Sequence, residues 1–235
     1  MDTESSVVPA TSAQPADWIV ADAAEDWANT VRWGPRGFAV YARVDFVPPG
    51  VEPGSTDDNE LYDVVFAVLA RFTGTPSQCW AAVWEGWCGE EAPTGSRGAL
   101  VSIPNREMLL YEADVSALPD VPHLAWQSPS PSQIAPHLSW PEDRRWCVAI
   151  EIDEELAFTV ACSEEAYAAL VAALPGQVRR AAWGDPEPMY ADTGDGQPID
   201  PRGLGEPIPP GAPGWQRYAA VGLLGGFGLG GMHDG

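Results

Sequence analysis

The sequence of 235 residues contains no lysine, so arginine supplies all twelve of its permanently cationic side chains. Against them stand 34 aspartates and glutamates, which gives a formal net charge of −22 at pH 7. Nucleic acids and anionic membranes are bound mainly by cationic side chains, so this balance argues against both as partners. It is compatible with a basic protein partner, although a high negative charge also serves simply to keep a protein in solution.

Cysteine and histidine are few and scattered. The four cysteines include no CxxC pair, and the three histidines lie far apart in the sequence. In a reducing compartment we expect such cysteines to be small buried hydrophobes. The usual ligand spacing is missing, so the sequence predicts neither a metal site nor a cofactor. These residues are Cys79, Cys88, Cys147, Cys162, His123, His137 and His233.

Sequence signatures of the common enzyme and targeting classes are also missing. No P-loop, GxSxG or HExxH occurs, and no GxGxxG follows an expected strand. No histidine lies beside a plausible nucleophile, which leaves a serine or cysteine triad without support. The first residues lack a cationic segment followed by an apolar core, and no run reaches the roughly 18 apolar residues of a membrane helix. The sequence therefore predicts a cytoplasmic protein.

The most informative stretch is residues 139–174, because successive elements can be read in it with a register. Apolar residues alternate over 146–152 and again over 156–160, the period of two half-buried strands. A three-residue loop between them would set Val148 opposite Val160 and place both apolar rows on one face, whereas a two-residue loop would expose half of the core row. The loop contains no glycine, so a longer loop is the alternative.

A helix is predicted to complete this stretch. The hydroxyl of Ser163 can cap its first turn, and Glu164 and Glu165 lie favourably at the positive end of the helix dipole. The expected register also places Cys147 and Cys162 on opposite faces of the sheet. The unit is therefore strand, strand, helix.

Two segments resemble the shared segments of one protein family. They are WPEDRRWCVAIEID, residues 140–153, and CWAAVWEGW, residues 79–87. Both are similar to segments found in a family of proteins from high-GC actinobacteria. The resemblance covers the middle of the chain, and because that family has no established activity, it implies membership of a group without implying a function.

The whole pattern predicts an α+β domain over residues 17–190, with a mostly antiparallel sheet and helices packed against it. Residues 1–16 are expected to be a disordered arm, residues 191–235 a Gly/Pro-rich tail, and the proline-rich segment 116–139 a long loop. Helices are expected over 17–33, from Asp57 or Asp58 to Phe72, and over 163–174; further strands are expected over 37–47, 78–85, 99–103, 106–113 and 177–183.

Carboxylates and tryptophans supply the best candidates for chemistry. Glu85 and Trp87 follow one expected strand, Asp143 precedes another, and Glu151 lies on the non-core face of that second strand. Two carboxylates at a suitable separation can serve as general acid and base, and tryptophan faces bind sugars or planar ligands. The simpler interpretations are a loop carboxylate that pairs with a neighbouring arginine or caps a turn for Asp143, and an exposed strand residue for Glu151.

Two classes of function remain. The first is an acidic cytoplasmic interaction protein, for example an immunity-type inhibitor that covers the basic site of a toxin; the net charge and the missing catalytic motifs favour it. The alternative is a small-molecule enzyme of hydrolase type that uses one of the three carboxylates above in a pocket lined by carboxylates and tryptophans. The residues expected to bind a partner are Glu154, Glu155, Trp87 and Trp140.

Overall fold

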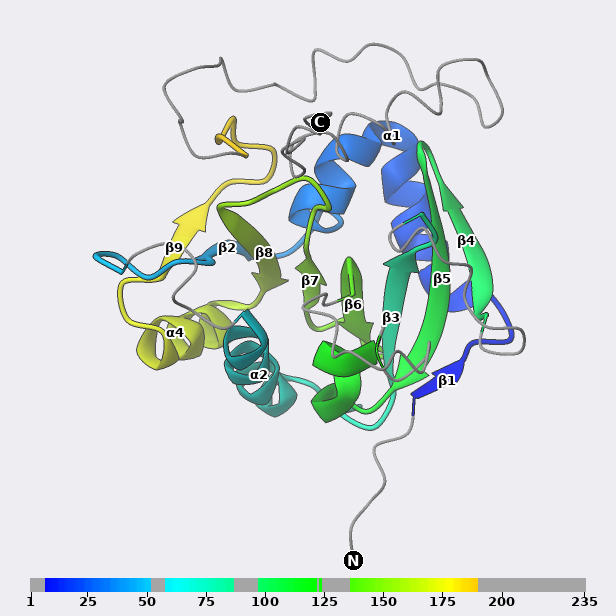
Figure 1. Cartoon of the computed structure of the whole chain (residues 1–235), viewed down its shortest axis with the longest axis horizontal. Coiled ribbons are helices and arrows are strands. Elements are labelled where there is room, and N and C mark those ends of the chain that lie inside the picture. The colour runs from blue at the N-terminus through cyan, green and yellow to red at the C-terminus, as the bar shows by residue number, and fades with distance from the viewer. Residues whose placement is uncertain (1–6, 52–57, 87–96, 122, 124–135, 190–235) are drawn as a thin grey trace, which may run out of the picture.

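The protein is an α+β fold in which one nine-stranded sheet carries helices on both faces (Figure 1). The structure, a computed structural model, describes residues 7–51, 58–86, 97–121, 123 and 136–189. The strands are β1 (Val7–Pro9), β2 (Val40–Asp45), β3 (Cys79–Trp84), β4 (Ala99–Ile103), β5 (Arg106–Ala113), β6 (Leu138–Pro141), β7 (Cys147–Ala149), β8 (Ala157–Cys162) and β9 (Val178–Ala181). The helices are α1 (Asp17–Trp33), α2 (Asp58–Leu69) and α4 (Glu164–Ala173), with 3-10 turns η1 (Gln14–Ala16), η2 (Ala70–Phe72) and η3 (Val115–Asp120).

Every neighbouring pair of strands in the sheet is antiparallel. The order is β1-β5-β3-β6-β7-β8-β2-β9, and β4 also pairs with β5. The predicted α+β class, with a mostly antiparallel sheet, is therefore confirmed. None of the helices in the described part of the chain is long and apolar enough to cross a bilayer.

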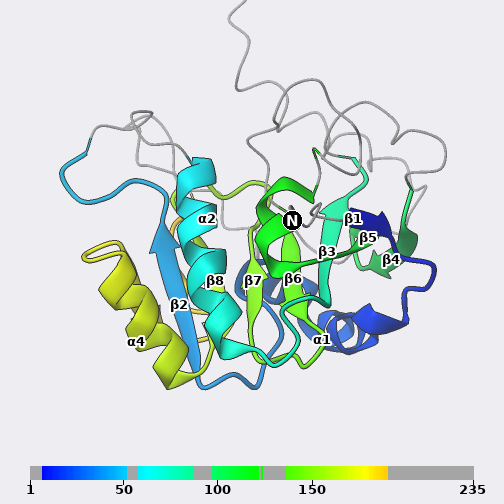
Figure 2. The same cartoon turned by 90° about the horizontal axis from the view of Figure 1, so that it is seen from below.

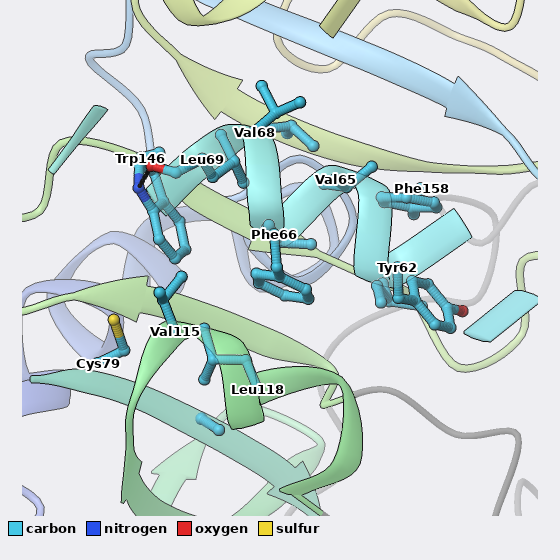
Figure 3. Close-up of a cluster of buried hydrophobic side chains, with 14 of the residues drawn as sticks. Tyr62, Val65, Phe66, Val68, Leu69, Cys79, Val115, Leu118, Trp146 and Phe158 are labelled. Atoms are coloured by element: carbon cyan, nitrogen blue, oxygen red, sulfur yellow. Dashed lines mark hydrogen bonds between the residues drawn. The ribbon is translucent and has the colours of Figure 1, made fainter. Parts of the chain in front are cut away.

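The sheet is buried on both faces, and a separate hydrophobic core lies against each. On one face α2, α4 and η3 pack over the sheet, and α2 and α4 lie next to each other (Figure 2). There the ring of Phe66 meets the ring of Trp146, whose indole N–H donates to the carbonyl of Leu69 at 3.1 Å (Figure 3). Fully burying one such side chain stabilises the fold by about 1.5–3 kcal/mol. On the other face α1 covers a second core that includes Trp33 and Trp140.

The central pair, β7 and β8, has the predicted register. Val148 lies opposite Val160, and Cys147 and Cys162 belong to cores on opposite faces of the sheet. The ladder ends at Ala149 and β8 begins at Ala157, so residues 150–156 form the connection. The expected three-residue loop is therefore wrong, and the longer loop is the one present. The expectation of half-buried strands is wrong, because α1 covers the second face as well, and both strands are buried throughout.

The helix α4 begins as predicted. The Oγ of Ser163 accepts a hydrogen bond from the backbone N–H of Ala166 at 3.3 Å, and Glu164 and Glu165 occupy the first turn. The segment that follows contributes β9 at the edge of the sheet, beside β2. Local cap chemistry therefore fixed this helix start correctly, as such signals do when no tertiary contact competes with them.

Two expectations about the chain outside the central unit are wrong. Residues 7–16 are not a disordered arm, because β1 pairs with β5 and the N–H of Ala10 donates to the carbonyl of Leu110 at 3.0 Å. The proline-rich segment 116–139 is not one loop, since it contains most of η3 and the first residues of β6. The strand β1 was missed because three residues are too few to show an alternating pattern, and because its partner β5 lies far away in the sequence. The expected tail, 191–235, and residues 1–6 lie outside the described residues.

Candidate functional site

Several sequence candidates meet at one end of the sheet, where β3 and β7 end and β5, β6 and β8 begin. The N–H of Glu85 donates to the carbonyl of Glu107 at 2.9 Å, and the N–H of Ile150 donates to the carbonyl of His137 at 2.8 Å. The first bond joins the end of β3 to the start of β5, and the second ties the loop over residues 150–156 to the residue before β6. This end therefore holds Glu85 and the acidic residues of the 150–156 loop.

Asp143 lies at the opposite end of the sheet, in the connection between β6 and β7. Its carboxylate accepts hydrogen bonds from the Thr73 hydroxyl at 2.9 Å and from the Gly74 N–H at 2.7 Å. The side chain thus joins the β6–β7 connection to the loop before β3. Asp143 cannot form a catalytic pair with Glu151, because the full length of β7 separates the two loops.

Glu85 and Glu151 each face an arginine. Glu85 forms an ion pair with Arg97. Glu151 was expected to be exposed, but only 8% of it is accessible, and it accepts from Nη2 of Arg106 at 2.8 Å. Burial lowers the pKa of Arg106, but the charge and hydrogen bond of Glu151 outweigh this, so the pKa of the guanidinium is raised overall. Both carboxylates therefore act as counter-ions in the structure.

The surroundings of Arg106 are aromatic and include a buried histidine. The guanidinium carbon lies 5.5 Å from the ring centroid of Trp27 and 5.6 Å from that of Trp84, within cation–π range. The backbone N–H of Trp84 donates to Nδ1 of His137 at 2.9 Å. Burial, followed by the charge of Arg106, lowers the pKa of His137 to about 3, so the imidazole is uncharged at neutral pH and a poor general base.

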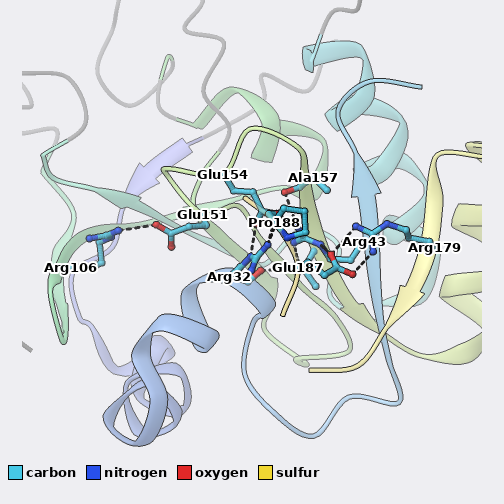
Figure 4. Close-up of polar contacts among 10 residues, drawn as sticks. Arg32, Arg43, Arg106, Glu151, Glu154, Ala157, Arg179, Glu187 and Pro188 are labelled. Carbon is cyan, nitrogen blue, oxygen red and sulfur yellow. Dashed lines mark hydrogen bonds and ion pairs between the residues drawn. The ribbon is translucent and has the colours of Figure 1, made fainter. Parts of the chain in front are cut away.

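Glu154 was expected to present its charge to a partner, and this is wrong. The residue is 6% accessible, and its carboxylate accepts from Nε and Nη2 of Arg32, both at 2.9 Å. It also pairs with Nη2 of Arg43, and Nε of the same arginine donates to the carboxylate of Glu187 at 3.1 Å (Figure 4). Burial, followed by the charge of Arg32, lowers the pKa of Arg43 to about 9. This cluster of two arginines and two glutamates holds the 150–156 loop against α1 and β2.

The remaining binding candidates have different fates. Glu155 is exposed, and only its backbone N–H is used, donating to the carbonyl of Met189 at 2.9 Å. Trp140 is 1% accessible and packs against Trp18 beneath α1, so the expectation that it binds a partner is wrong. Trp87 lies outside the described residues. Of the expected binding surface, Glu155 is the residue that the structure shows to be accessible.

A shallow groove of about 180 Å³ lies between α2 and η3. Five of its lining residues are apolar, and the other two are Asp63 and Ser116. In α2, the small residue Ala67 lies one turn after Asp63, and this pattern could have indicated a groove on that side of the helix. The opposite wall, η3, could not be predicted, because most of it lies in the proline-rich segment that was expected to be a loop. The apolar residues that line the groove are Phe66, Ala67, Ala70, Val115 and Pro119.

Comparison of the chain with protein-family models, curated proteins and solved structures found no match. Within the described ranges, no three residues of the metal-binding types gather into a group that could hold an ion. Function therefore has to be inferred from the chemistry of this chain's own surface: buried carboxylates neutralised by arginine, exposed carboxylates, and one small apolar groove.

Proposed function

We propose that this protein is an acidic interaction protein of the cytoplasm that binds a basic protein partner, in the manner of an immunity-type inhibitor that covers its partner's cationic site. The observation that carries the proposal is the distribution of charge. Seven arginines of the described chain form ion pairs with the fold's own acids. These arginines are Arg32, Arg36, Arg43, Arg97, Arg106, Arg179 and Arg180.

This distribution leaves a surface that attracts cations. Exposed acids such as Glu60, Asp120 and Glu155 form no ion pair with an arginine of the described residues. Like charges on one surface raise the local concentration of an oppositely charged partner and speed its association. They also disfavour acidic partners, because like-charge contacts are repulsive.

The alternative, a small-molecule enzyme of hydrolase type, has weaker support. Its three candidate carboxylates are distributed over two ends of the sheet, and each is held by contacts that explain it structurally. A general acid or base must reach the proton it transfers, and a carboxylate engaged by an arginine is not offered to a substrate. The accessible groove, moreover, has one carboxylate among its lining residues.

The experiment that tests the proposal is recovery of the partner from the source organism on the immobilised full chain, at low and at high salt. We expect a protein with a net positive charge that is retained at about 0.1 M salt and released at about 1 M, because the Debye length falls from about 10 Å to about 3 Å over this range. A partner that is acidic, or a small molecule retained equally at both salt concentrations, would overturn the proposal.

A further inference from the structure

The groove between α2 and η3 combines an apolar floor with an acidic rim. Phe66 of α2 and Val115 of η3 are both buried and line the groove; Figure 3 shows their side chains in the space between the two elements, and the exposed Ala67 also lines it. A volume of about 180 Å³ is close to the roughly 150 Å³ of an apolar cavity that holds one benzene molecule. The groove therefore has room for one aliphatic or aromatic side chain.

Acids occur on both elements that form the groove. On α2, Asp63 lines the groove, and Glu60 is exposed one turn earlier. At the two ends of η3 lie Asp114 and the exposed Asp120. Arg71, next to the lining residue Ala70, is exposed and keeps its positive charge, and it donates from Nε to the carbonyl of Val68 at 3.4 Å. The four acids on α2 and η3 outnumber this arginine, so the balance of charge on the two elements is negative.

From this combination we infer that the groove between α2 and η3 is the docking site for a cationic segment of the partner protein, with one apolar side chain seated in the groove and arginine or lysine residues on either side of it. The inference rests on the proposed function, since it names the surface and the partner chemistry. The groove is much smaller than the exposed apolar patches that mark whole interfaces, so it offers a seat for one anchoring side chain, and the charges around it supply the rest of the recognition. Here the sign of the rim selects a basic partner and disfavours a second copy of this acidic chain.

The probes are two short synthetic peptides of equal positive charge, one with a central leucine between arginines and the other with serine in its place. Binding to the full chain is measured by fluorescence anisotropy and mapped by amide shifts in NMR spectra. We expect the leucine peptide to bind about tenfold more tightly, the ratio that corresponds to burying most of one aliphatic side chain. The shifted amides should include those of Ala67, Ala70 and Ser116.

Matched variants distinguish binding in the groove from the effect of adding one positive charge anywhere on the surface. Ala67→Arg fills the groove, whereas Ala172→Arg makes the same change at an exposed alanine of α4; arginine is a good helix former at both positions. We expect Ala67→Arg to abolish the preference for leucine and Ala172→Arg to retain it. Ser116→Arg, on the opposite wall, should act like Ala67→Arg and so guards against a folding defect in one variant.

Two outcomes would overturn the inference. If the peptides bind equally in a salt-dependent way, or shift amides away from the groove, the acidic surface binds cations but the groove is not the docking site, and the proposed function stands. If the groove amides shift on dilution of the chain alone, the occupant is a second copy and the inference fails. Failure of the proposed function is distinct, because it would appear as a recovered partner that is acidic or insensitive to salt.

Discussion

Glu154→Gln should destabilise the protein severely, because Glu154 is the carboxylate shared by two buried arginines. Arg32 and Arg43 both donate to it, and the side chains of the three residues are between 0% and 8% accessible. The glutamine amide could still accept one hydrogen bond, but the two guanidinium groups would face each other, and among the described residues the remaining carboxylate in contact with them would be Glu187, which pairs with Arg43. Removing one partner of a buried ion pair costs about 3–5 kcal/mol.

The assay is urea unfolding followed by tryptophan fluorescence, with a thermal scan beside it. For a domain of this size the expected loss corresponds to a fall in the thermal midpoint of roughly 6–20 °C. Glu155→Gln is the matched control, because the neighbouring side chain is exposed and its loss should cost less than about 0.5 kcal/mol. Equal stability of the two variants would refute the buried ion cluster.

A double substitution measures the interaction energy between Arg43 and Glu154 apart from the contribution of each side chain alone. Arg43→Met combined with Glu154→Met removes both charges and leaves an apolar pair of similar length. The double variant stays destabilised, because Arg32 also loses the carboxylate of Glu154, but removing Arg43 relieves the second uncompensated charge. The double variant should therefore be less destabilised than the sum of the single ones, with a coupling of about 1–3 kcal/mol. Strict additivity would mean that Arg43 and Glu154 do not interact.

Two further predictions concern the same end of the sheet. The pKa of His137 is about 3 in the fold and roughly 6.5 in an unfolded chain, so on acidification the unfolded state binds the proton first, and the free energy of unfolding should fall by about 2 kcal/mol between pH 6.5 and pH 5. In urea titrations, His137→Asn should remove this part of the pH dependence. An unchanged dependence of stability on pH in the variant would contradict the prediction. Glu151→Gln should cost about 1–3 kcal/mol, because it removes the charge that faces the largely buried Arg106; a loss below about 0.5 kcal/mol in the same titration would mean that Glu151 is exposed after all.

Local periodicity predicted much of the fold. The alternation around Val148 and Val160 predicted their pairing, and the hydroxyl of Ser163 marked the start of α4, because both signals lie within one continuous stretch of the chain. The burial of Glu154 could not be read this way. Its partner Arg43 lies 111 residues away, so only the assembled sheet brings the two charges together.

The candidate site was less predictable than the fold. The alternating pattern placed Glu151 on the face opposite the core beneath α2 and α4. It could not show that α1 covers that second face, or that Trp140 is buried in the core beneath α1. The groove depends on α2 and η3 meeting across the chain, which no single segment encodes. Pattern predicts which way a side chain points in a strand, whereas burial also depends on what packs above it.

The association rate of the full chain with its recovered partner, measured by stopped flow at two ionic strengths, tests the central claim most directly. The charge distribution predicts a rate that falls as salt rises, and a slower rate at low salt for Asp120→Asn or Glu155→Gln, with little change for Glu85→Gln or Asp143→Asn. A rate independent of salt, together with loss of a turnover reaction in Glu85→Gln or Asp143→Asn, would contradict binding by charge and identify an enzyme instead.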